Sequence, residues 1–142
     1  MSIFLLLGFN LFVSSSVPLG TAATDVPSGF TLMIGGKHKI NYDFIGSYYS
    51  GSNYDIKLYG IAMGKELSLG KKFSILPEAG LLNGKRVREE SSENGYSPFV
   101  LVRFAYLFTT ESSTLQIGFS LREVFNGQVG TDFLDFGIGF RM

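Results

Sequence analysis

The final segment of the chain, residues 131–142, reads TDFLDFGIGFRM, and its residues alternate between two classes. Bulky apolar residues occupy every second position: Leu134, Phe136, Ile138, Phe140 and Met142. The positions between them are small or charged: Asp135, Gly137, Gly139 and Arg141. Because successive side chains of a strand point to opposite faces, this segment is predicted to be a β-strand with one apolar face.

The same alternation recurs in six segments upstream. They cover residues 30–35, 39–49, 54–69, 73–83, 97–108 and 114–125. Most exceed the ~5–6 residues usual in globular sheets and suit the ~9–11 residues of a tilted membrane-spanning strand. A loop at residues 36–38 predicts three apolar pairs across the first hairpin, namely Ile34 with Ile40, Leu32 with Tyr42, and Phe30 with Phe44.

Composition narrows the class of protein. The 142 residues include 12 basic and 12 acidic side chains, so no overall field favours nucleic acid as a partner. Charged residues make up 17%, below the ~25% of ordinary soluble domains. The chain has no cysteine, which excludes disulfides and thiolate chemistry, and no apolar run reaches the ~18 residues of a transmembrane helix. We expect one domain over residues 1–142, without a cofactor or a metal.

The two faces of the predicted strands differ in a way that favours a membrane barrel. One face is aromatic and aliphatic, whereas the other mixes small residues with isolated charges. Those charges are Asp43, Glu66, Glu78, Arg103, Arg122, Asp135 and Arg141. A narrow barrel interior would bring the three arginines to the four carboxylates, and buried charges require such pairing. Apolar outside and polar inside is the transmembrane β-barrel pattern. The alternative is a soluble, exported lipocalin-like barrel whose aromatic residues line a cavity for an apolar ligand.

The connections follow the rule that outer-membrane barrels have short periplasmic turns and longer external loops. Counted back from the C-terminus, the connections near 126–130, 84–95 and 50–53 are predicted to lie outside. Those near 109–113, 69–72 and 36–38 are predicted to be periplasmic turns. The aromatic residues near strand ends are interpreted as an interfacial girdle: Tyr48, Tyr49, Tyr96, Tyr106, Phe108 and Phe125.

The seven strands predicted so far are one too few, because bacterial single-chain barrels have an even number of strands. The remaining residues open the chain as MSIFLLLGFNLFVSSS, which also alternates. We therefore predict an eighth strand at about residues 3–14, paired with residues 131–141 and followed by an external loop. The alternative for residues 1–23 is a signal peptide cleaved after Thr21-Ala22-Ala23. The strand interpretation implies an export signal upstream of this chain.

The ending LDFGIGFRM resembles the C-terminal strand by which the assembly machinery recognises bacterial outer-membrane barrels. Phe136, Ile138 and Phe140 match that pattern, whereas the last residue is Met142 and not Phe. Size and strand count resemble the small OmpA-like and OmpX-like barrels. The resemblance implies a bacterial outer-membrane protein, an all-β, antiparallel, up-and-down transmembrane barrel of eight strands. It also implies contact with outer-membrane lipid and lipopolysaccharide, and a role in envelope integrity or surface interaction through external loops.

Candidate chemistry is sparse. His38, the one histidine, is predicted to be a solvated turn residue at the periplasmic rim, away from the site of a lipid-modifying barrel enzyme. The interior charges are interpreted as a structural network in a packed barrel, with a gated ion path as the alternative. Three basic residues of the longest external connection could contact lipopolysaccharide phosphates or a partner surface: Lys85, Arg86 and Arg88. We predict no enzymatic activity, with the lipid-modifying enzyme kept as the alternative.

Overall fold

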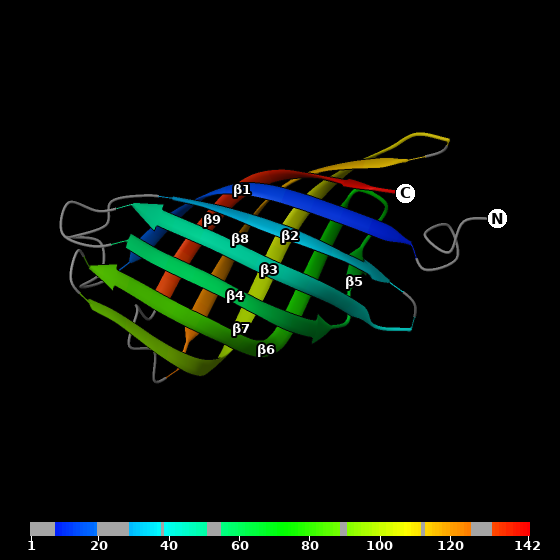
Figure 1. Ribbon diagram of the computed structural model, residues 1–142. Coiled ribbons are helices and arrows are strands. Elements are labelled where there is room, and N and C mark those ends of the chain that lie inside the picture. The colour runs from blue at the N-terminus through cyan, green and yellow to red at the C-terminus, as the bar shows by residue number, and fades with distance from the viewer. Residues whose placement is uncertain are drawn as a thin grey trace.

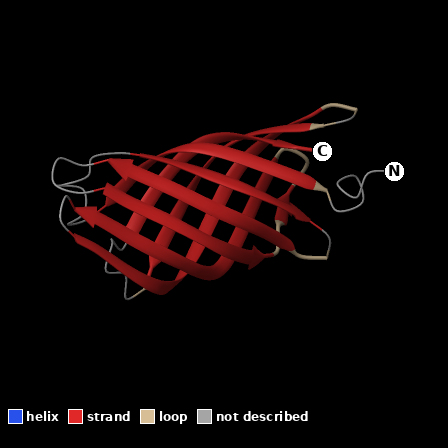
Figure 2. Cartoon of the chain, in the orientation of Figure 1, coloured by secondary structure: helices blue, strands red, loops and turns tan. Residues whose placement is uncertain are grey.

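The computed structural model describes residues 8–19, 29–37, 39–50, 55–88, 91–111, 113–125 and 132–142, with the backbone alone for 86–88 and 91–95. Within these ranges every regular element is a strand (Figure 2). The strands are β1 (Phe9–Leu19), β2 (Gly29–Lys37), β3 (Asn41–Ser50), β4 (Asp55–Gly64), β5 (Leu67–Leu69), β6 (Phe73–Arg88), β7 (Ser91–Thr109), β8 (Thr114–Val124) and β9 (Asp132–Arg141). None of the described residues belongs to a helix that could span a membrane.

The strands form one closed antiparallel sheet (Figure 1). Its order is β4-β3-β2-β1-β9-β8-β7-β6, and pairing of β4 with β6 closes the cylinder. Strands consecutive in sequence pair with each other, except that β4 and β5 both pair with β6, and β1 joins β9. The C-terminus and the β2–β3, β5–β6 and β7–β8 connections lie at one end of the barrel (Figure 1). This alternation agrees with the predicted up-and-down topology.

The barrel has eight strands, as predicted, because β4 and β5 are two parts of one. Gly64 faces Glu78 and Leu67 faces Ile75, so both parts keep the same register along β6. Continuing that register places Lys65 opposite Pro77, which has no backbone N–H to donate to the ladder. The break between β4 and β5 therefore follows from a missing donor in β6.

The opening stretch contributes a strand, but its predicted bounds were wrong. β1 begins at Phe9 and runs through the serines to Leu19, whereas residues 1–7 lie outside the described part of the chain. It pairs with β9 from Asn10 opposite Arg141 to Leu19 opposite Asp132. The segment SSVPL, predicted to begin a loop, continues the strand because β9 pairs with it as far as Leu19, and β2 pairs with its first two serines.

Two further predictions are corrected. In the first hairpin, Ile34 pairs with Phe44 and Phe30 with Tyr48, in place of Ile40 and Phe44. The slip is by an even number of residues, so every side chain keeps its face. The segment 84–95, predicted to be an external loop, consists mostly of the ends of β6 and β7, with β4 paired to β6 as far as Val87.

The outer surface of the barrel is an apolar belt to which each strand around the cylinder contributes. Phe44 and Ile138 are 63% and 60% exposed. We define the belt by one outward residue from each of eight strands: Val13, Leu32, Phe44, Ile61, Leu81, Phe104, Ile117 and Ile138. A soluble monomer rarely exposes a contiguous apolar surface of such extent. The soluble alternative required the aromatic rows to face inward, and they face outward.

One of the residues predicted to belong to the aromatic girdle is inside the barrel. Tyr49 is fully buried, whereas its neighbour Tyr48 is on the outer face. Consecutive strand residues point to opposite faces, so only one of the two tyrosines could face lipid. Tyr49 shares its parity with Asp43 and Ser47, a signal that the sequence already contained.

Candidate functional site

The seven ionisable residues predicted to line the interior form three groups along the barrel. Each group contains one arginine and an acidic partner from another strand. The ion pairs are Arg122–Asp135, Arg103–Asp43 and Arg141–Glu66. Glu78, the seventh residue, has no arginine of its own among the described interior side chains.

The group nearest the end of the barrel opposite the C-terminus surrounds Arg122. Its Nη2 atom lies 3.5 Å from Asp135 Oδ1 and donates to the Tyr49 hydroxyl at 2.8 Å, while Nη1 donates to Ser47 at 3.0 Å. The guanidinium carbon also lies 4.7 Å from the centre of the Phe133 ring. Arg122 and Asp135 are both fully enclosed, and this network of partners stabilises their charges in the barrel interior.

The middle group has two acidic side chains, Asp43 and Glu78, for one arginine. Arg103 lies 4.0 Å from Asp43, packs over Phe12 at 4.4 Å and contacts the Met33 sulfur. Glu78 lies beside Asp43 and Arg103. Neither carboxylate has a hydrogen-bond partner among the described residues. Two carboxylates therefore share one guanidinium here.

The third group lies at the end that carries the C-terminus. Arg141 Nη1 binds Glu66 at 2.7 Å, and Nη2 donates to the Gln116 side-chain oxygen at 3.2 Å. Gln116 in turn donates to Asn10 at 2.9 Å. The Arg141 side chain is 20% exposed, so this group borders the solvent while the other two are enclosed.

Between the charged groups the interior is filled by apolar side chains, which the sequence interpretation missed. The buried apolar cluster contains Phe12, Met33, Ile45, Tyr49, Ile56, Leu58, Ala62, Leu82, Phe99, Leu101, Val124 and Phe133. Eight-stranded barrels are just wide enough for side chains to fill them. Phe99 and Leu101 share their strand parity with Arg103, so parity alone could have placed them inside.

Three arginines pair with three of the four interior acids, which predicts different effects for two isosteric substitutions. Asp135→Asn removes a carboxylate that accepts from Ser120 at 3.1 Å and pairs with Arg122, so we expect a loss of about 3 kcal/mol in unfolding free energy. Glu78→Gln replaces the acid left out of these pairs, whose oxygens have no hydrogen-bond partner among the described residues, so we expect no loss. Urea unfolding of both variants in zwitterionic micelles tests this. Equal losses would show that Glu78 is as fully paired as Asp135.

The three basic residues predicted to contact external partners lie on strand β6 and not in a loop. The Lys85 side chain is partly exposed. For Arg86 and Arg88 the structure describes the backbone alone. Lys85 is the register partner of Lys57 on β4, and Lys57 lies over the Tyr48 ring at 5.9 Å. Like charges opposite each other are unfavourable unless an anion joins them, so this pair forms a candidate phosphate contact.

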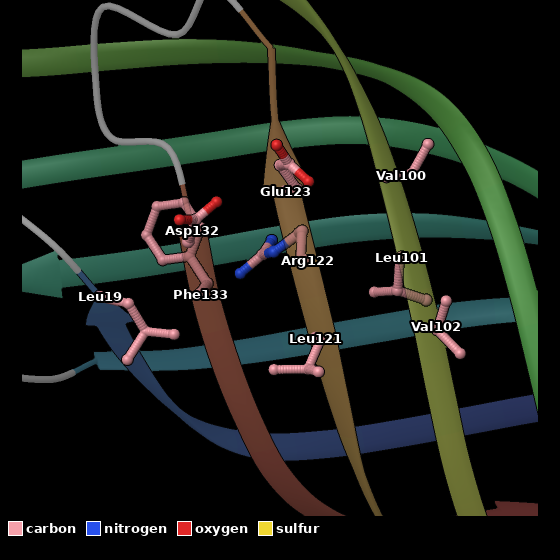
Figure 3. A pocket seen from close by; sticks show the side chains of 9 residues that line it. All are labelled: Leu19, Val100, Leu101, Val102, Leu121, Arg122, Glu123, Asp132 and Phe133. Carbon is pink, nitrogen blue, oxygen red and sulfur yellow. The ribbon is translucent and has the colours of Figure 1, made fainter.

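A second feature lies at the same end, over β7, β8 and β9. A pocket of about 400 Å³ is lined by the residues in Figure 3, among them the register partners Glu123 and Asp132. Leu19, Val100 and Leu121 line it with apolar surface. Within the described ranges no three acidic or histidine side chains gather to hold a metal ion. His38 lies outside the described residues.

Comparison with solved structures identifies the fold. No protein-family model matches the sequence, and neither does any curated protein. Neisserial surface protein A superposes with a TM-score of 0.63 at 11% identity, covering 95% of both chains. This chain has the fold of the small bacterial outer-membrane barrels. The predicted resemblance to the OmpA-like and OmpX-like barrels is confirmed at the level of fold.

Two further structures of this barrel class agree. The N-terminal β-barrel domain of OprF from Pseudomonas aeruginosa gives a TM-score of 0.62 at 12% identity, covering 95% of this chain and 97% of that one. The outer-membrane protein Ail of Yersinia pestis, in a phospholipid bilayer nanodisc, gives 0.59 at 11% identity, covering 96% and 99%. The fold of this chain is therefore one that spans the bacterial outer membrane.

Proposed function

We propose that this protein is a non-catalytic integral protein of the bacterial outer membrane that supports envelope integrity or contacts neighbouring surfaces through its external end. The observation that carries the proposal is the apolar belt around the whole barrel. In water the belt would expose large aromatic and aliphatic side chains on all sides, whereas in lipid it is favourable. The similarity to the small outer-membrane barrels supports the same location.

A structural role fits the interior better than catalysis does. Each arginine of the interior is engaged with a carboxylate, and apolar side chains fill the space between the groups. A hydrolase would need a nucleophile and a base in a wet cleft. The ionisable groups of the described interior are arranged as partners of one another, which is the arrangement of a stabilising network.

The external contact that fits the surface is with phosphate groups of lipopolysaccharide. Lys57 and Lys85 point outward from adjacent strands near the external rim, beside Tyr48. Lysine is a compact cation suited to phosphate, and interfacial tyrosine anchors a barrel at the headgroup level. The C-terminal strand β9, with Phe136, Ile138 and Phe140 outward, also presents the pattern expected by the assembly machinery.

One fractionation experiment tests both parts of the proposal. After expression in a lipopolysaccharide-bearing host, the protein should sediment with outer membranes, resist extraction by urea and migrate differently on gels before and after boiling. Lipopolysaccharide that remains bound after detergent purification should fall several-fold in the Lys57→Ser/Lys85→Ser variant.

The matched control for that variant is Lys37→Ser/Lys39→Ser, which removes the same charge at the opposite end and should retain lipopolysaccharide. Recovery of the parent protein in the soluble fraction without detergent would overturn the membrane location. Equal retention by both double variants would overturn the phosphate contact while leaving the location intact.

A further inference from the structure

A groove crosses the outer face of the barrel at the end that carries the C-terminus. It has a volume of about 400 Å³ and is almost wholly apolar. Its floor is a row of small register partners, Ser74, Ala105 and Gly118, on β6, β7 and β8. The side chains of Ser74 and Ala105 point into the barrel and Gly118 has none, so the outer face of this row is bare backbone and the rows on either side of it rise as walls.

Both walls are built from cross-strand rows of large side chains. The wall nearer the rim contains Phe73 and Tyr106, whose rings meet edge to face with centres 5.1 Å apart. The deeper wall contains Phe104, Phe119 and Phe136, with ring centres 5.2 Å and 6.1 Å apart along the row. A channel between two apolar rows can accommodate an extended hydrocarbon chain.

The groove starts at the rim and goes deeper into the membrane as it crosses the strands. Its first floor residue, Ser74, is next to the first residue of β6, whereas Gly118 lies well within β8. The turn between Leu69 and Phe73, which both line the groove, carries Lys71 and Lys72, both exposed. The backbone N–H of Leu107 donates to the Lys72 carbonyl at 2.6 Å, which attaches this turn to β7.

The exposed charges at this end are unbalanced. The described residues place five exposed lysines there, with Glu111 as the exposed acid: Lys37, Lys39, Lys65, Lys71 and Lys72. Such a collar raises the local concentration of anions at the membrane surface. Lys71 and Lys72 differ from the others because the apolar groove opens beside them.

We infer that the groove and the Lys71–Lys72 turn together bind one anionic phospholipid of the periplasmic leaflet. An acyl chain lies between the two aromatic rows, and the lysines bind the phosphate headgroup. This inference rests on the proposed membrane location, because only in a bilayer is a lipid the neighbour of this face. It adds a specific lipid site at the end opposite to the proposed lipopolysaccharide contact.

The test compares lipid selectivity in vesicles of phosphatidylcholine that contain one part in ten of phosphatidylglycerol. The full-length protein is inserted, and electron spin resonance of spin-labelled lipids gives the ratio of phosphatidylglycerol to phosphatidylcholine bound at its surface. Lys71→Ser/Lys72→Ser should bring this ratio close to one, since each lysine near a surface contributes about five-fold to the binding of an anionic lipid at its own site. Lys37→Ser/Lys39→Ser removes equal charge from a turn that does not border the groove and should lower it much less.

A third variant separates the groove from the charge. Phe104→Ala/Phe119→Ala keeps both lysines and removes two of the three rings of the deeper wall, and it should also lower the ratio. Equal reductions in the two lysine variants would mean that the collar attracts anions without a site, which overturns the inference. Failure of the parent protein to insert into vesicles would instead overturn the proposed function.

Discussion

Replacing Arg122 by methionine is expected to lower the unfolding free energy by about 3–5 kcal/mol, the cost of leaving one partner of a buried ion pair alone. Methionine keeps much of the arginine stem but none of its donors. Asp135 would lose its cation, and the hydroxyl groups of Tyr49 and Ser47 would lose the guanidinium that donates to them. The urea midpoint of the refolded protein in zwitterionic micelles measures this loss.

A double variant shows whether the loss comes from the orphaned carboxylate. Removing both charges with Arg122→Met/Asp135→Leu should recover a large part of the stability, because a buried pair exchanged for apolar groups is often nearly neutral. The interaction energy from the complete cycle should exceed 0.5 kcal/mol. If the losses of the two single variants simply add in the double variant, or if Arg122→Met alone leaves the urea midpoint unchanged, the Arg122–Asp135 ion pair is not the main stabilising contact at its end of the barrel.

Replacing Gly80 by valine is the second change for which we expect a large effect. A β-carbon at Gly80 would overlap the carbonyl oxygen of Ile61 on the neighbouring strand β4. Backbone cannot move aside as a side chain does, so β4 and β6 would have to separate where their pairing closes the barrel. We expect a loss of about 3 kcal/mol and a reduced refolding yield.

Gly46 supplies the matched control. It is also a glycine within a strand, but a β-carbon there meets nothing within 4 Å. It shares the outward parity of Phe44 and Tyr48, so Gly46→Val places an apolar side chain among the belt residues and should leave stability unchanged or higher. Heat modifiability on gels and the urea midpoint distinguish the two variants. Equal behaviour would show that the barrel tolerates displacement of β6 from β4.

The belt and the interior charges were predictable because the face of a strand residue depends only on its parity. Phe136 and Ile138 lie outward and Asp135 inward for the same local reason. The even strand number then required the opening stretch to form a strand. Tyr49 and the apolar residues beside Arg103 obey the same rule. Their inward position could have been predicted from parity, although their aromatic or aliphatic character suggested the outer face.

The bounds of the strands were less predictable, because polar residues pair their backbones as well as apolar ones do. Ser14 and Ser16 belong to β1, and Lys85 belongs to β6, since neighbouring strands supply their hydrogen bonds. Registers differ by even steps that leave the apolar pattern unchanged. Alternation therefore could not choose between Phe44 and Tyr48 as the partner of Phe30.

By itself the sequence determined that this protein is built of strands with one apolar face and one small or charged face, because strand parity is a property of consecutive residues. Only the tertiary structure decided which side chains surround each interior arginine. Arg122 contacts Ser47 and Tyr49, and Arg103 contacts Met33, across separations that no local pattern encodes. The groove at the lysine turn has the same origin, since its floor and walls consist of residues from several strands brought into one register.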